Sequence, residues 1–172
     1  MIDEVEIQPR PRVLLVGEDN PLSDDAEHAL YCWPEGCSGW RLRRILGLTE
    51  KQYLTLDRTN LCSPRWNGAA AIARAAVLVA HDSPYRVIVM LGRKVTGAFR
   101  AALGLHEMRV WSVTKPDNPL SPSAGQPGIT PLTLVSLPHP SGNCREWSHA
   151  GAVARARAIL REVAPHVPWG EV

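Results

Sequence analysis

RVIVMLG, at residues 86–92, is the stretch that decides the fold of this chain. Its apolar residues, Val87 to Leu91, follow one another without a polar interruption and end at Gly92. A short continuous apolar run that ends in a turn residue is typical of a strand buried on both faces, as in a parallel sheet. A second run of this kind, VLLV at residues 13–16, and the mainly apolar stretch LTLVSL at residues 132–137 indicate other strands of the same sheet.

The segments between these runs have the patterns of helices and loops. Ser38 is an expected N-cap, and a capping sequence at residues 49–52 opens a short helix. We expect the other helices at residues 38–47, 67–81, 94–103 and 150–163. Further strands are expected at residues 57–62 and 109–113. Loops are expected at residues 18–34, 115–131 and 138–147. Strands that alternate with helices predict an α/β fold, a single domain over residues 1–172 with a mainly parallel, four- to five-stranded sheet and helices on both faces.

The bulk properties narrow the class of protein. No apolar run is long enough to span a bilayer, and the polar, acidic residues 1–12 do not resemble a secretory signal. The 4 cysteines contain no C-x-x-C pair, so we expect small buried thiols and neither a metal nor another cofactor. We therefore expect a monomeric cytoplasmic protein without a membrane partner. A net charge of +2 neither requires nor excludes nucleic acid, because a local patch matters more than the total.

Polar segments follow three of the predicted strands: GEDNP at residues 17–21, TNLC at 59–62 and HPSGN at 139–143. Functional sites of parallel sheets form at the carboxyl ends of the strands, so we expect these segments to converge. Glu18 and Asp19 could orient a water molecule or stabilise a developing cation. The alternative is a solvated acidic turn in which Asp19 or Asn20 satisfies backbone amides.

The two prolines around His139 stiffen its loop, and a fixed histidine can donate a hydrogen bond to an oxygen on which negative charge develops. Gly142 allows close approach of a ligand, and Ser141 can contact phosphate through its hydroxyl and its backbone amide. The alternative is a rigid surface turn with a solvent-facing histidine.

Together these segments resemble the uracil-DNA glycosylase superfamily. VLLVGEDNP at residues 13–21 is similar to the first motif of that family, and LPHPSGN at residues 137–143 is similar to its second. Asn60 after a strand resembles the base-reading asparagine, and Tyr31 lies near the position of the aromatic ring that stacks on the base. The turn at residues 37–39 and Gly92 match the branch whose first motif is Gly-Glu-Ala-Pro. The order of the segments agrees over most of the chain.

The resemblance implies a DNA glycosylase that acts by base flipping in base excision repair, on uracil or another deaminated or modified pyrimidine. It implies catalytic roles for Glu18, Asp19 and His139. It also implies further contacts, to the base from Gly17, Asn20, Tyr31 and Asn60, and to DNA from Arg65, Ser141, Gly142, Asn143 and Arg145.

The chain departs from the family pattern at several positions. The first motif carries one residue more before its proline, so the water-positioning residue can be Glu18, Asp19 or Asn20. Asn143 stands where several relatives carry a leucine, and the cysteine spacing of the iron–sulfur branches is absent.

Other readings stay open. The same fold could bind a base or DNA without cleaving it, or could excise bases from modified foreign DNA in defence. An unrelated hydrolase with Ser141 or a cysteine as nucleophile is a further alternative, although a Gly-x-Ser-x-Gly elbow is absent around Ser141.

Overall fold

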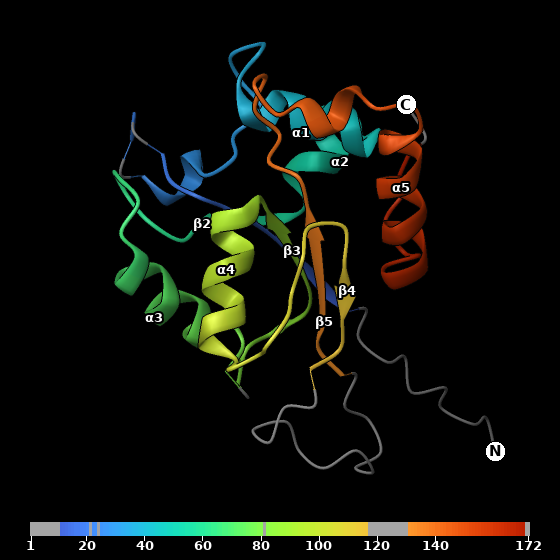
Figure 1. Ribbon diagram of the computed structural model, residues 1–172. Coiled ribbons are helices and arrows are strands. Elements are labelled where there is room, and N and C mark those ends of the chain that lie inside the picture. Colours follow the sequence, from blue (N-terminus) through green and yellow to red (C-terminus); the bar gives the residue numbers. More distant parts are fainter. Residues whose placement is uncertain (1–10, 21, 24, 81, 117–130, 171–172) are drawn as a thin grey trace, which may run out of the picture.

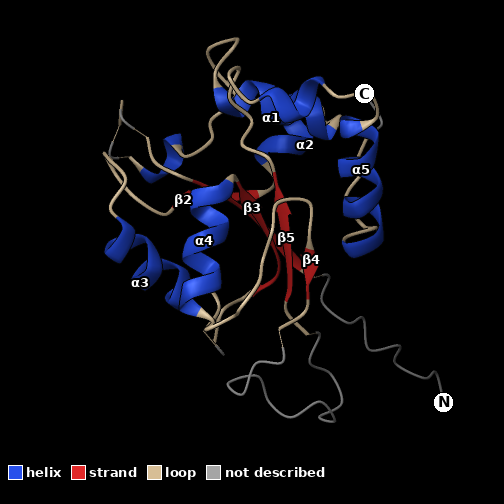
Figure 2. Cartoon of the chain, viewed as in Figure 1, coloured by secondary structure: helices blue, strands red, loops and turns tan. Residues whose placement is uncertain are grey.

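The computed structural model describes residues 11–20, 22–23, 25–80, 82–116 and 131–170. Pro21, His81 and most of the predicted loop at residues 115–131 lie outside the described residues, as do residues 1–10. The fold is a five-stranded sheet in the order β2-β1-β3-β5-β4, with helices on both faces (Figures 1 and 2). The strands are β1 (Arg12–Gly17), β2 (Asp57–Asn60), β3 (Tyr85–Leu91), β4 (Val113–Thr114) and β5 (Thr133–Leu137). The α/β architecture expected from the sequence is therefore confirmed.

The two helical layers follow from the alternation of side chains along the central strands. The α-helices are α1 (Ser38–Leu46), α2 (Glu50–Leu54), α3 (Gly68–Leu78), α4 (Arg93–Ala102) and α5 (Ala152–Val163), and the short 3₁₀ helices are η1 (Ala26–His28) and η2 (Arg145–Ser148). Val87, Val89 and Leu91 of β3 pack in one core with α1 and α5, whereas Ile88 and Met90 pack in a second core with α3 and α4. Both faces of β3 are thus buried, as its unbroken apolar run predicts.

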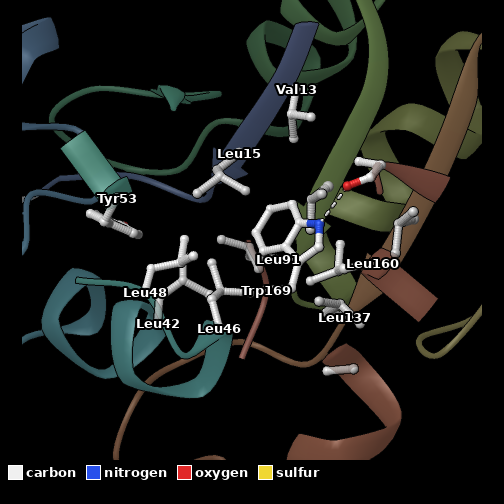
Figure 3. Packing of buried hydrophobic residues seen from close by; sticks show 14 of the residues in the cluster. Val13, Leu15, Leu42, Leu46, Leu48, Tyr53, Leu91, Leu137, Leu160 and Trp169 are labelled. Atoms are coloured by element: carbon white, nitrogen blue, oxygen red, sulfur yellow. Dashed lines mark hydrogen bonds between the residues drawn. The ribbon is translucent and has the colours of Figure 1, made fainter. Parts of the chain in front are cut away.

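Trp169 closes the first core from the C-terminal side. Its indole is almost fully buried, packs in the same cluster as Leu91, Leu137 and Leu160, and donates a hydrogen bond of 2.8 Å to the carbonyl oxygen of Ala164 (Figure 3). This core fixes the strands whose carboxyl ends carry the polar segments.

Several predicted boundaries were wrong in detail. The Cys37 side chain caps α1 by accepting a hydrogen bond from the amide of Trp40, so Ser38 is the first helical residue and not the cap. The strand expected at residues 57–62 ends at Asn60, and the helix expected at residues 67–81 ends at Leu78.

The strand expected at residues 109–113 is also wrong. Trp111 adopts a left-handed backbone conformation with φ of 69°, which interrupts an extended strand. Only Val113 and Thr114 form β4, and they pair antiparallel with β5 at the edge of the sheet. The other four strands are parallel. Among the described residues, no helix has the length and apolar character needed to cross a membrane.

Candidate functional site

A pocket of about 540 Å³ opens at the carboxyl edge of the sheet. The chain leaves β1 for β2 on one side and returns to β3 on the other, so β1 and β3 flank the point at which the strand order reverses. Ligands of open parallel sheets bind at such a crevice. Glu18 after β1, Asn60 at the end of β2 and His139 after β5 all line this pocket, so the three polar segments do converge.

Glu18 and His139 meet beside Gly92. A Cβ atom on Gly92 would lie 3.1 Å from Glu18 Oε1 and 3.1 Å from His139 Cβ, which shows that both side chains lie against this residue. Gly92 has φ of 98° and ψ of 164°, a conformation that is essentially restricted to glycine. The close approach of the acid and the histidine therefore depends on a glycine at the end of β3.

The ring of His139 is held in one orientation by its own loop. The backbone amide of Ser141 donates a hydrogen bond of 3.1 Å to Nδ1. Nδ1 is therefore an unprotonated acceptor, and in the neutral ring the proton is on Nε2. The loop is anchored in turn by Trp147, whose indole nitrogen donates to the carbonyl oxygen of His139 at 3.0 Å. The site consequently holds a neutral histidine with one N–H donor.

The surroundings of His139 favour this neutral form. Its pKa lies below the ordinary value of 6.5, chiefly because burial disfavours the imidazolium. The negative charges of Glu18 and Asp19 act in the opposite direction, and the positive charge of Lys94 also lowers the pKa.

Lys94 is a site residue that the sequence analysis missed. Its Nζ atom lies 3.0 Å from Oε2 of Glu18, whose side chain is 19% exposed. The same ammonium group lies 5.7 Å from the ring centroid of Trp66. Pairing with Glu18 raises the pKa of Lys94, so the lysine carries a positive charge. Its place two residues after Gly92, the glycine that follows β3, is the signal that could have identified it.

Asp19 and Asn20 are used by the backbone of neighbouring loops. Asp19 Oδ2 accepts a hydrogen bond of 2.8 Å from the amide of Trp66. The Asn20 side chain accepts from the amide of Leu22 and donates to the carbonyl oxygen of His28. Both residues line the pocket, and Glu18 is the candidate for positioning water that lies, like His139, against Gly92.

Asn60 and Gly17 form a pair at the ends of two strands. They are direct partners in the register of β1 and β2. The Oδ1 atom of Asn60 occupies the space where a side chain on residue 17 would lie, so Gly17 makes room for the amide. No hydrogen-bond partner of this amide occurs among the described residues. This residue lines the pocket, and the oxygen and the NH₂ group of its amide are available to a ligand.

Tyr31 forms part of an aromatic wall. It is 39% exposed and lines the pocket, as does Trp33, which is 49% exposed and was missed from the sequence. The backbone at Leu30 and Tyr31 lies directly against Gly39 of α1, so a larger residue at position 39 would clash with it. Exposed aromatic faces beside an unpaired amide suit a planar, polar ring.

The remaining predicted residues lie outside the pocket. Ser141 is half-buried, and its amide is occupied by His139, which corrects the expectation that this amide contacts phosphate. Gly142 and Asn143 are exposed in the same loop. Arg65 and Arg145 are exposed, and neither has an ion-pair or hydrogen-bond partner in the part of the chain that the structure describes.

The cysteines and carboxylates form no cluster of three or more that could hold a metal ion, within the described ranges. Cys32 and Cys62 are buried free thiols, as expected. Cys37 and Cys144 are only half-buried, and Cys37 lines the pocket as the cap of α1.

Comparison with known proteins gives no match for this chain among protein-family models, curated proteins or solved structures.

Proposed function

We propose that this protein is a DNA glycosylase that hydrolyses the N-glycosidic bond of uracil or another deaminated or modified pyrimidine after flipping the nucleotide out of the helix. The observation that carries the proposal is the contact of Glu18 and His139 with the same residue, Gly92, in a pocket that Asn60 and Tyr31 also line. An acid and a neutral histidine donor at one point, next to an amide and an aromatic ring, suit cleavage of a bond between a sugar and a planar base.

The base would be recognised by its ring and its edge. Tyr31 offers a face for stacking, and the unpaired amide of Asn60 can both accept from a ring N–H and donate to a carbonyl oxygen. A base within a duplex cannot reach such a pocket, so the nucleotide has to leave the stack.

Bond cleavage separates charge, and the two sides of the pocket match that separation. As the bond to C1′ breaks, its electron pair leaves with the base, and positive charge develops on the sugar. The Nε2–H group of His139 would donate to the base oxygen on which negative charge accumulates. The Glu18 carboxylate would stabilise the sugar cation and orient the water molecule whose oxygen bonds to C1′. The base finally takes up one proton of that water.

A serine hydrolase fits these contacts less well. Nδ1 of His139 already accepts from the amide of Ser141, and the Ser141 hydroxyl has no hydrogen-bonded base among the described residues. The oxygen of Ser141 is therefore not activated as a nucleophile.

The direct test is base release from a panel of oligonucleotides that carry uracil or modified pyrimidines, read as abasic sites after alkaline cleavage. We expect release from at least one substrate and a loss of about 100-fold or more in His139→Ala, by analogy with removal of one oxyanion donor. Binding of the same DNA without any release would indicate a recognition protein instead. Near wild-type release by His139→Ala would refute the role of the histidine.

A further inference from the structure

A second pocket, of about 470 Å³, is lined by one side of α4 and by the chain segment at residues 108–111. Among the described residues, it shares no lining residue with the pocket at the carboxyl edge of the sheet. Its volume is that of a pocket for a small molecule. Neither the base nor the catalytic side chains proposed above would occupy it, so it is a separate candidate site.

Positive charge dominates the wall of this second pocket. Arg93, Arg100 and Arg109 line it, whereas Glu146 is the one carboxylate among its described lining residues. Oε2 of Glu146 accepts a hydrogen bond of 3.0 Å from the indole nitrogen of Trp111, and its Oε1 lies 3.5 Å from Nη2 of Arg93. One carboxylate among three guanidinium groups leaves an excess of positive charge, which attracts an anion.

Two of these arginines are held only weakly by the protein itself. Arg100 donates a hydrogen bond of 3.5 Å to the carbonyl oxygen of His106, longer than the usual range of about 2.7–3.2 Å. Arg109 lies 3.4 Å from Glu107, but both side chains are exposed, and ion pairs of this kind contribute little. Both guanidinium groups can exchange these contacts for the stronger, paired hydrogen bonds that arginine forms with a carboxylate or a phosphate.

The rest of the lining is apolar and leaves room for a ligand. Met108 and Val110 are half-buried and line the pocket, and methionine adapts its shape to an apolar neighbour. Gly97 of α4 lines it as well, and a Cβ atom on this residue would meet nothing within 4 Å. An inorganic ion would leave this apolar surface exposed to water, whereas an organic group attached to the anion would cover it.

Trp111 fixes one wall of the pocket in a strained conformation. Its φ of 69° is costly for a residue other than glycine. Its backbone amide donates a hydrogen bond of 2.7 Å to the carbonyl oxygen of Ser136 in β5, and its indole donates to Glu146. Strain that the surrounding contacts maintain in this way is concentrated at binding and catalytic sites.

We infer that this second pocket binds a small organic anion, in which a carboxylate or a phosphate monoester is attached to an apolar group. Arg100 and Arg109 would bind the anionic oxygens, and the apolar group would lie on Met108 and Val110, in the space beside Gly97. The inference is independent of the proposed glycosylase activity, because it uses none of the residues assigned to the base or to the chemistry.

The experiment titrates the whole chain with four probes and follows the indole N–H signal of Trp111 by NMR, assigned by its loss in Trp111→Phe. Phenyl phosphate and phenylacetate carry the two anionic groups on a phenyl ring, inorganic phosphate is the anion alone, and phenol is the ring alone. We expect at least one of the first two to bind with a Kd on the order of 1 mM or lower, as suits a ligand of this size. Inorganic phosphate and phenol should bind at least about tenfold more weakly, and the tighter organic probe identifies the anionic group.

Two kinds of variant test the contacts. Arg100→Gln and Arg109→Gln each remove a charged hydrogen-bond donor and should weaken binding of the tighter probe about tenfold. Arg74→Gln is the matched control, because Arg74 is exposed on α3 and does not line this pocket. Gly97→Leu keeps every charge but fills the space beside α4, and leucine suits the interior of a helix. It should abolish binding without lowering the melting temperature.

Binding of inorganic phosphate as tight as that of both organic probes would indicate a simple ion site and overturn the inference. Equal binding by Arg74→Gln, Arg100→Gln and Arg109→Gln, unchanged binding by Gly97→Leu, or no shift of the Trp111 signal with either organic probe would do so as well. Displacement of the probe by an unmodified DNA duplex would assign these arginines to a DNA surface instead. Binding of the probe by a protein that releases no base would refute the glycosylase activity alone.

Discussion

Replacing Gly92 with alanine should separate the catalytic geometry from the rest of the fold. The φ of 98° and ψ of 164° lie in a region that other residues avoid, at a cost of about 1–3 kcal/mol. In a chain of this length that cost lowers the melting temperature by roughly 2–4 °C per kcal/mol. The new methyl group would also stand 3.1 Å from both Glu18 Oε1 and His139 Cβ, so each must move by a few tenths of an ångström.

That movement should be visible in the chemistry. A displacement of about 1 Å in a catalytic group costs about 100-fold in rate, so we expect base release to fall by roughly 10- to 100-fold in Gly92→Ala. Gly97→Ala is the matched control, because Gly97 lies in the interior of α4 and an added Cβ would meet nothing within 4 Å. The free energy of unfolding of that variant should rise by about 0.5–1 kcal/mol, and its rate of base release should stay unchanged. Thermal unfolding measures the stability of the two variants, and single-turnover base release measures their activity. Wild-type stability and activity in Gly92→Ala would refute the close approach described for this glycine.

Three further perturbations test the electrostatics of the pocket. The pKa of His139 is lowered in the folded protein, so the histidine contributes stability above about pH 6.5, and this contribution is lost as the pH falls through the folded pKa. The free energy of unfolding of wild type, compared with that of His139→Gln, should therefore fall on acidification. A difference in favour of wild type that grows on acidification would contradict this. Lys94→Gln should raise the pKa of His139, because the charge of Lys94 lowers it, and Glu18→Gln should lower that pKa, because the charge of Glu18 raises it. A histidine NMR titration measures both shifts in pKa, and Arg93→Gln is the control. Glu18→Gln should reduce base release by about 100-fold or more. Asp19→Asn should mainly lose about 1 kcal/mol of stability, because it weakens the hydrogen bond that Asp19 accepts from the amide of Trp66. Similar, mild losses of base release in Glu18→Gln and Asp19→Asn would argue against a catalytic role for either acid.

The sequence was a good guide to the fold wherever burial was continuous. The run at residues 86–92 and the run at 13–16 became inner strands of the sheet, because a short continuous apolar segment that ends in a turn residue suits a strand with both faces buried. The segment at residues 109–113 misled because its pattern suits a strand, whereas the left-handed turn at Trp111 is set by tertiary contacts. The Trp111 indole donates to Glu146, and its ring packs edge-on against Trp147.

The site could be predicted in part. Its strand-end residues, Glu18, Asn60 and His139, follow from the rule that the carboxyl ends of parallel strands meet at one edge. Lys94 could not be separated from the ordinary charged residues of helical surfaces, because its place in the site depends on a contact with Glu18, 76 residues away in the chain. Asp19 and Asn20 could not be distinguished from Glu18 by type, since only the geometry of the loop assigns them to backbone amides.

The pair formed by Trp111 and Trp147, next to His139, gives this protein a near-ultraviolet circular dichroism signal close to the pocket. Trp111 and Trp147 lie with their ring centroids 5.3 Å apart at 67°, a distance at which their electronic transitions couple. Trp147 also donates a hydrogen bond to the backbone of His139. An occupant that displaced the backbone of His139 would disturb this hydrogen bond and with it the packing of Trp147 on Trp111, and near-ultraviolet circular dichroism would report that change without a label and without turnover.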